Sequence, residues 1–312
     1  MLIDSKVDEN GNFQNLYIKW GDANVAIFKK GNDITHPILE PILDDLLVSP
    51  DHIKKIQEKI QKWFEETYLS KLDLSDKLKK FNSKPEERSF IFKIIESQYN
   101  LYQINILDEF KLFDEPQRKE IHSLNFRLGK NVIFNSELIR PEYMKLKFYL
   151  WNLYNNKCLN IDEYIPKDGN ATLNIQNKLN EELLTFLGFI SKNDLLIRLD
   201  IFNEFEKQLF KRENRGPFSL PMDLSNLLGI KKDKLISILE SRSFNIQEIA
   251  ENDLIISKKI TTYKTLDFKQ NKNKKVLKKP PKKVKKPLPK KLFNNPFEQL
   301  KNCLLYTSPS PR

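Results

Sequence analysis

Ser123–Asn156 has the sequence SLNFRLGKNVIFNSELIRPEYMKLKFYLWNLYNN, and it is the densest apolar segment of the 312-residue chain. Its first part alternates apolar and polar residues up to a turn at Gly129-Lys130-Asn131, and an apolar triplet follows, which predicts a short β-hairpin. Pro141 suits the first position of a helix, and the apolar residues after it recur at helical spacing around a wide arc. We therefore expect a hairpin followed by a helix that is buried on most sides.

This stretch resembles a signature in the C-terminal region of alphaproteobacterial superfamily-two helicases, which are relatives of the RNA helicase of the mitochondrial degradosome. In that signature a hairpin with an R-x-G motif precedes a helix that begins at Pro and ends in Leu-Trp, as Arg127–Gly129 and Pro141–Trp151 do here. A second block is similar to the same region: Phe186-Leu-Gly188-Phe189, Arg198-Leu-Asp200, and Pro221 through Leu227-Leu228-Gly229 to Leu239.

The resemblance implies a non-catalytic accessory region of an ATP-dependent helicase, which clamps or guides RNA or DNA beside an upstream motor in the same chain. The expected partners are a single strand of nucleic acid and that motor, with no membrane involved. ATP and Mg²⁺ would bind only to the motor, so we expect no cofactor here. We also expect a further segment before Met1.

Periodicity predicts a mainly α fold with short β-hairpins, an α+β class. Helix starts are predicted at Ser49-Pro50 and at two capping boxes, Ser83-Lys-Pro-Glu86 and Asp114-Glu-Pro-Gln117. The expected parts are an N-terminal β-hairpin segment (1–48), a helical subdomain with the central hairpin (49–157), a polar linker (158–178), a winged-helix-like subdomain (179–260) and a disordered tail (261–302).

The winged-helix prediction rests on the last folded segment. Asp223–Leu228, a turn at Gly229 and Lys232–Ser241 have the spacing of a helix-turn-helix, and Phe244–Ile249 with Leu254–Lys258 would form the wing. At the start of the second helix, Lys231, Lys232 and Lys234 could contact phosphates, although a solvated surface explains each of them alone.

The charge of the chain is unevenly distributed. The formal net charge is +11, yet residues 1–257 contain 36 Lys and Arg against 40 Asp and Glu, while residues 258–291 contain fifteen Lys and one Asp. This Lys-rich segment holds few core-forming residues and several Pro. The C-terminal tail (261–302) is therefore predicted to be disordered. Clustered Lys releases counterions on neutralising phosphates, and we favour nucleic acid over a membrane surface or a solubilising role. The predicted contacts are Lys274, Lys275, Lys278, Lys279, Lys282, Lys283, Lys285 and Lys286.

Further candidates flank the central hairpin or lie in the family-like blocks. Arg127, Lys130 and Arg198 are predicted to contact nucleic acid, and a structural ion pair is an equal alternative for Arg127 and Arg198. Two rival functions remain open. A free-standing winged-helix protein would bind duplex without the tail, and a protein-interaction subunit would bind nucleic acid weakly throughout.

Motifs for catalysis are missing from the sequence. Gly129-Lys130 precedes Asn131 inside a hairpin, so it does not form a P-loop, and the three His are too far apart in sequence to predict a metal site. The two Cys predict no disulfide framework, which favours a cytoplasmic location. Residues 303–312 resemble a translated transposase sequencing adaptor, and we treat them as lying outside the natural protein.

Overall fold

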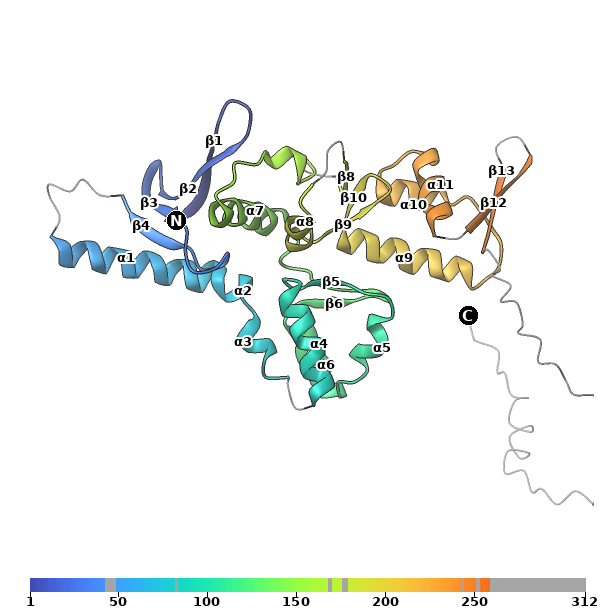
Figure 1. Ribbon diagram of the computed structural model, residues 1–312, viewed down its shortest axis with the longest axis horizontal. Helices are drawn as coiled ribbons and strands as arrows, with labels where there is room; N and C mark the ends of the chain where they lie inside the picture. Colours follow the sequence, from blue (N-terminus) through green and yellow to red (C-terminus); the bar gives the residue numbers. More distant parts are fainter. Residues whose placement is uncertain are drawn as a thin grey trace, which may run out of the picture. The chain divides into compact units, whose positions relative to one another are not determined.

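The computed structural model describes residues 1–42, 49–81, 84–167, 170–175, 179–242, 244–250 and 253–258 (Figure 1). Met1–Thr261 form one compact unit. Within its described residues, short helices are interspersed with four small antiparallel sheets, which confirms the predicted α+β class. The predicted tail and the adaptor-like residues lie outside the described part of the chain.

The N-terminal sheet is an antiparallel meander in the order β1-β2-β3-β4. Leu16 and Ile18 alternate with polar neighbours along β2, which places both side chains in the core. The first helix lies against β4, but Ser49 does not cap it as predicted, because the Ser49 hydroxyl bonds instead to Nδ1 of His52 at 2.8 Å. The elements are β1 (Leu2–Val7), β2 (Phe13–Trp20), β3 (Ala23–Lys29), β4 (Ile38–Pro41), α1 (Pro50–Phe64), the π-helical turn η1 (Glu65–Leu69) and α2 (Ser70–Leu72).

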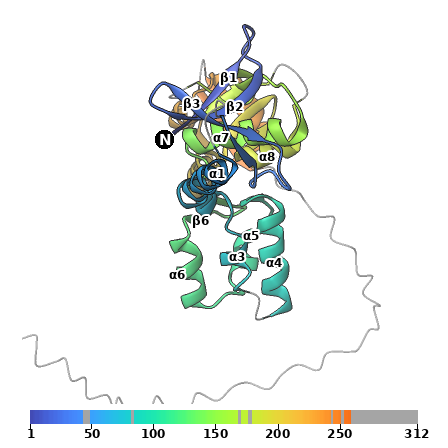
Figure 2. The same ribbon diagram turned by 90° about the vertical axis from the view of Figure 1, so that its left-hand side faces the viewer.

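The next helices share one core with the predicted central hairpin (Figure 2). The hairpin forms β6 and β7, and β7 is the central strand of the sheet β5-β7-β6, with all its residues buried. The predicted capping box is present, because the Asp114 carboxylate accepts from the Gln117 backbone N–H and the Gln117 side chain accepts from that of Asp114. The predicted cap Ser83 lies outside the described residues. The elements are α3 (Ser75–Leu78), α4 (Pro85–Glu96), β5 (Asn100–Tyr102), α5 (Ile106–Phe110), α6 (Glu115–Ser123), β6 (Phe126–Leu128) and β7 (Val132–Asn135).

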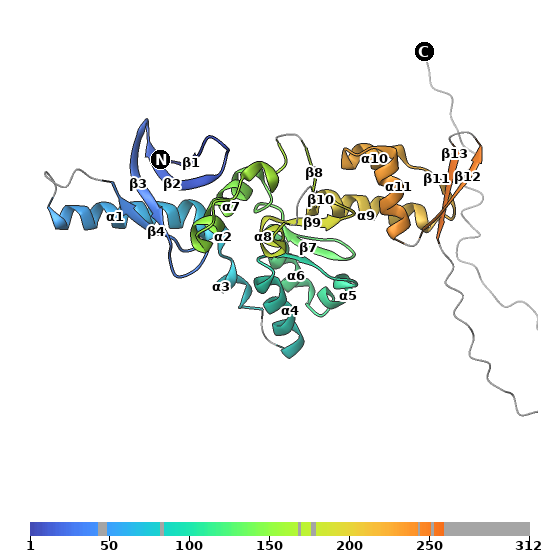
Figure 3. The same cartoon turned by 45° about the horizontal axis from the view of Figure 1, so that its top comes forward.

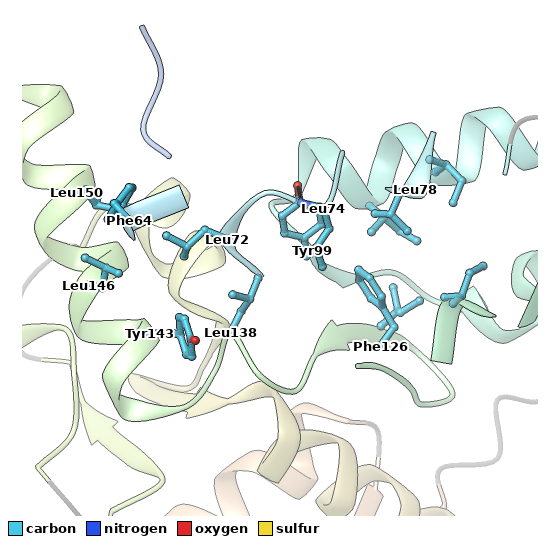
Figure 4. Packing of buried hydrophobic residues seen from close by; sticks show 14 of the residues in the cluster. Phe64, Leu72, Leu74, Leu78, Tyr99, Phe126, Leu138, Tyr143, Leu146 and Leu150 are labelled. Carbon is cyan, nitrogen blue, oxygen red and sulfur yellow. Dashed lines mark hydrogen bonds between the residues drawn. The ribbon is translucent and has the colours of Figure 1, made fainter. Parts of the chain in front are cut away.

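Helix α7 (Pro141–Asn155) is buried on opposite sides, as its wide apolar arc predicts. Tyr143, Leu146 and Leu150 enter the same cluster as Phe64 and Leu72 (Figure 4). On the other side, α7 packs against α8 through a second cluster, so the helix contacts both β2 and α8 (Figure 3). The residues of α7 in that second cluster are Met144, Phe148 and Trp151.

The stretch predicted to be a linker is partly packed into the fold. Tyr164 and Ile165 are buried in the cluster of Trp151, and Thr172–Asn174 form an edge strand of the sheet β8-β10-β9. A few apolar residues within a polar stretch therefore hold it against its neighbours, which its average composition does not reveal. The elements are η2 (Ile161–Glu163), β8 (Thr172–Asn174), α8 (Glu181–Leu187), β9 (Phe189–Lys192) and β10 (Leu195–Arg198).

The remaining elements form a separate hydrophobic cluster. The helix pair and the hairpin after it lie where the sequence predicts them, and Gly229 makes the turn between the helices with φ +62°. The strands form a sheet in the order β11-β13-β12. The elements are α9 (Leu199–Glu213), β11 (Phe218–Ser219), α10 (Met222–Leu228), α11 (Lys232–Ser241), β12 (Phe244–Ala250) and β13 (Asp253–Lys258).

Two glycines of the family-like blocks occupy positions without room for a side chain. Gly188 ends α8 with φ +88°, and a Cβ there would lie 2.5 Å from Cγ2 of Ile139. A Cβ at Gly129, in the central hairpin, would lie 1.9 Å from Oδ1 of Asn203 on α9. These glycines therefore permit close contact of the central segment with α8 and α9.

Gly188→Ala is expected to destabilise the chain more than Gly229→Ala does. Both residues end a helix at positive φ, but a Cβ at Gly229 meets nothing within 4 Å. The steric clash at Gly188 should therefore lower the free energy of unfolding by roughly 1–3 kcal/mol beyond the backbone strain that the two variants share. Urea denaturation measures both variants, and equal losses would contradict this explanation.

Lys147 is a buried cation on α7. Its side chain is 1% exposed, its amine has no hydrogen-bond partner in the described part of the chain, and Nζ lies 4.7 Å from the centroid of the Phe186 ring. Burial lowers the pKa of the Lys147 amine from 10.5 to about 7. Between these values the unfolded chain binds a proton that the folded chain lacks, so the free energy of unfolding rises with pH across this interval.

Lys147→Met is expected to raise the free energy of unfolding at pH 7 by roughly 2–4 kcal/mol, because it removes an unpaired buried amine. The variant should also lose most of the rise in stability between pH 7 and pH 9. Lys145→Met is the control, since Lys145 is exposed on the same helix. Urea denaturation at both pH values tests this, and an unaltered pH dependence in Lys147→Met would contradict it.

Candidate nucleic-acid interface

A cleft of about 530 Å³ lies where the tip of the central hairpin meets α9 and the C-terminal hairpin. One wall is formed by Tyr102, Ile104, Asn105, Lys130 and Asn131, and residues of α9 between 206 and 213 form the floor. Arg242, Phe244 and Lys258 line the remaining side. We call this site the hairpin-tip cleft. Its walls come from three distant parts of the sequence, so only the folded chain contains it.

Asn131 fixes the position of the hairpin tip. The Asn131 carbonyl oxygen accepts from the Gln103 N–H at 2.9 Å, and its side-chain Oδ1 accepts from the Asn105 N–H at 3.2 Å. Asn105 itself has φ +61°, a conformation that Asn tolerates better than most residues. These bonds hold the segment after β5 against the tip and present Ile104 to solvent, where its side chain is 72% exposed.

Glu206 is the buried charge of the cleft. Its side chain is 6% exposed, and both carboxylate oxygens lie 3.4 Å from Nδ2 of Asn131. Glu206 also pairs with Arg242, whose guanidinium lies 5.3 Å from the Phe202 ring centroid and 5.8 Å from that of Phe205. One carboxylate therefore connects the hairpin tip, α9 and the residue that follows α11.

Burial, together with the negative charge of Glu206, raises the pKa of Tyr102. The phenol therefore remains protonated at neutral pH and keeps a hydrogen-bond donor at the edge of the cleft. Lys192 Nζ lies 5.2 Å from the centroid of the same ring. Tyr102 thus combines a polar tip with an aromatic face that lies close to a cation.

Cations and apolar side chains lie side by side in the cleft. Lys130 Nζ lies 4.2 Å from the centroid of the Phe210 ring, and Lys258 pairs with Glu213. Phe210 is 41% exposed. Cationic groups beside exposed rings are the combination with which proteins bind single-stranded nucleic acid, since phosphates meet the cations and bases stack on the rings.

Of the predicted nucleic-acid contacts that the structure describes, Lys130 lies in the cleft, whereas the remaining ones do not line it: Arg127, Arg198, Lys231, Lys232 and Lys234. Arg198 forms a bidentate pair with Asp200, with N···O distances of 2.7 and 2.9 Å, which favours the structural alternative for this residue. Arg127 is exposed on β6, and its Nη1 lies 3.4 Å from the Phe126 carbonyl oxygen. The eight tail residues, Lys274, Lys275, Lys278, Lys279, Lys282, Lys283, Lys285 and Lys286, lie outside the described residues.

Lys231, Lys232 and Lys234 lie at the start of α11, whereas Arg242 follows its end, so about 15 Å of helix separates the two groups. The side of α11 near this start contacts the sheet β8-β10-β9. The Lys234 ammonium bonds to Asn174 of β8, and Nδ2 of Asn193 donates to the Ser237 carbonyl and hydroxyl oxygens at 2.8 and 2.9 Å. The structure therefore does not bring these lysines together with Lys130.

Sequence reasoning missed most of the cleft. Tyr102, Glu206 and Phe210 have no local motif that distinguishes them from core or surface residues. Arg242 offered a weak signal, because it is a cation directly after the predicted second helix. The rest depends on tertiary contacts among segments that are far apart in the sequence.

Among the described residues, no group of three or more His, Cys, Asp and Glu is arranged to hold a metal ion. No helix in the described ranges is both long enough and apolar enough to cross a membrane. Comparison of the chain with protein-family models, with curated proteins and with solved structures found no match. The helicase resemblance of the sequence thus stays a prediction.

Arg242→Met is expected to lower the free energy of unfolding by roughly 2–4 kcal/mol, because it leaves the buried Glu206 carboxylate without its ionic partner. Adding Glu206→Gln should recover part of this loss, since the uncompensated charge is then removed. Urea denaturation of both single variants and the double variant measures the coupling. Lys207→Met is the control, because its pair with Glu204 is exposed. Strictly additive losses at positions 206 and 242 would contradict the coupling.

Proposed function

We propose that this chain is a non-catalytic accessory region of a superfamily-two type helicase, and that it binds a single strand of RNA or DNA in the hairpin-tip cleft. In this proposal the chain guides the strand beside an ATP-driven motor located upstream in the same protein. The observation that carries the proposal is the placement of Lys130, Arg242 and Lys258 around the apolar side chains of one cleft. The family-like sequence blocks support it independently.

The dimensions of the cleft favour a single strand. Its volume of about 530 Å³ lies in the range of small-molecule sites, which have room for individual nucleotides. Proteins read a duplex by inserting an element such as a helix into its major groove. Here Asn174 and Asn193 already contact α11, the helix that would serve this purpose. We therefore expect tighter binding of single strands than of duplex.

The C-terminal subdomain is proposed to be a winged helix. Its order of elements, α9-β11-α10-α11-β12-β13, and its sheet order, β11-β13-β12, agree with such a domain, in which the last hairpin is the wing. In this proposal the base of the wing, through Arg242, Phe244 and Lys258, forms one side of the cleft. The subdomain would thus contact the strand through the wing rather than through α11.

The Lys-rich segment (residues 258–291) is proposed to increase encounter and retention. The fifteen Lys of this segment attract a polyanion at distances up to about a Debye length, and this attraction requires no specific contact geometry. Lys contacts to phosphate carry no direct sequence information. The cleft and the Lys-rich segment would therefore contribute differently: the first should sense the bases, and the second should depend strongly on salt.

A protein-interaction subunit is the second candidate, and exposed apolar side chains on the N-terminal sheet favour it. Leu2 is 70% exposed in β1 and Trp20 is 73% exposed at the end of β2. Large apolar side chains exposed in this way favour a surface that another protein covers. This function predicts weak nucleic-acid binding that does not depend on Lys130.

Lys130→Ala is expected to weaken single-strand binding about five- to tenfold, because it removes one charge-assisted bond to a phosphate. Fluorescence anisotropy with single-stranded RNA, single-stranded DNA and duplex, at several salt concentrations, measures this in the full chain. Lys211→Ala is the matched control, since Lys211 is exposed directly after Phe210 but does not line the cleft.

A variant of the full chain with Gln at the eight predicted tail lysines separates the contribution of the Lys-rich segment to binding from that of the cleft. The replaced residues are Lys274, Lys275, Lys278, Lys279, Lys282, Lys283, Lys285 and Lys286. The salt dependence should become shallower by about 0.7 in log Kd per log salt for each phosphate that the tail no longer neutralises, while Lys130-dependent binding remains. If this variant no longer binds single strands at low salt, the cleft does not bind them and the proposal is wrong.

A further inference from the structure

The cations of the hairpin-tip cleft differ in the group that each already contacts, which is a carboxylate for two of them and an aromatic ring for the third. Arg242 pairs with the buried carboxylate of Glu206, and Lys258 pairs with the carboxylate of Glu213, whose side chain is 20% exposed. Lys130 instead lies over the neutral ring of Phe210 at 4.2 Å. An incoming phosphate must compete with a negative charge at the first two residues but only with a ring at the third. Lys130 is therefore the cation that a phosphate recruits most easily.

Phe210 is the most accessible ring of the cleft among its described lining residues. Phe244 is 5% exposed, and Tyr102 is partly buried, with its ring packed edge-on against Phe202 at 5.6 Å. Phe210 is 41% exposed at the C-terminal end of α9. Packing in the hydrophobic core therefore does not explain why an aromatic residue stands at this position. The Lys130 ammonium lies over this ring, so departure of Lys130 would leave the ring open to another planar group.

We infer that Phe210 is the base-stacking residue of the cleft and that a bound strand displaces Lys130 from its ring to a backbone phosphate while a base takes the place of the ammonium. This inference rests on the proposed function and names the residue that senses bases. No covalent step is involved. The four-carbon stem of Lys130 lets the ammonium move while the hairpin tip stays fixed by Asn131.

The exchange is energetically reasonable. An exposed cation–π contact is weaker than a charge-assisted contact to phosphate, and a base stacked on an aromatic ring adds a further favourable contact. The ring that loses the ammonium and the ring that gains the base are the same, so no apolar surface is left newly exposed. The cleft would accordingly bind a strand with bases more tightly than a polyanion of equal charge.

The test compares two strands of the same length and charge, one with bases and one abasic throughout, in anisotropy titrations of the full chain. Phe210→Leu should weaken binding of the strand with bases about tenfold and binding of the abasic strand less than twofold. Phe92→Leu is the matched control, because Phe92 is 58% exposed on α4 and does not line the cleft, and it should change neither affinity. Urea denaturation of Phe210→Leu verifies that the variant folds.

The outcomes separate this inference from the proposed function. If Lys130→Ala weakens strand binding but Phe210→Leu affects both strands equally or neither, the stacking role is wrong and the cleft remains a phosphate site. If the unaltered chain binds no single strand, or if Lys130→Ala has no effect, the proposed function fails and the inference fails with it. A loss confined to the strand with bases supports the exchange.

Discussion

The burial of α7 on opposite sides is the constraint on which the rest of the fold depends. Tyr143, Leu146 and Leu150 belong to the cluster that contains the N-terminal sheet, and Met144, Phe148 and Trp151 belong to the cluster that contains α8 and β10. The hairpin before α7 adds Val132 and Phe134 to a further cluster with Leu199, at the start of α9. One continuous segment thus supplies three clusters, so a change in its position would disturb packing throughout the described unit.

Local sequence signals predicted the elements of this fold well. Alternation and a Gly-containing turn indicated the central hairpin, Pro141 marked the start of α7, and Asp114 with Gln117 formed the predicted capping box. Signals failed where a tertiary or competing contact decided the outcome. Ser49 bonds to the His52 ring instead of the helix backbone, and Tyr164 is buried within a stretch whose polar composition predicted a linker.

The candidate site was less accessible to prediction than the fold. Lys130 was identified because a turn and a hairpin can be recognised from a few adjacent residues. Phe210 and Glu206 belong to an amphipathic helix, and only the contact of that helix with the hairpin tip distinguishes them from their neighbours. The same contact adds a reason for Gly129 beyond its predicted place in the turn, because Asn203 of α9 occupies the space of a side chain.

The position of Glu206 also determines how the cleft can open locally. Asn131 on the hairpin tip and Arg242, which follows α11, both bind this one carboxylate. If either partner detaches alone, the buried Glu206 carboxylate loses one of its two partners without gaining full hydration. The free-energy cost of opening is therefore shared between the two segments. The hairpin tip and the end of α11 would then behave as one cooperative unit in native-state hydrogen exchange, although more than a hundred residues of sequence separate them.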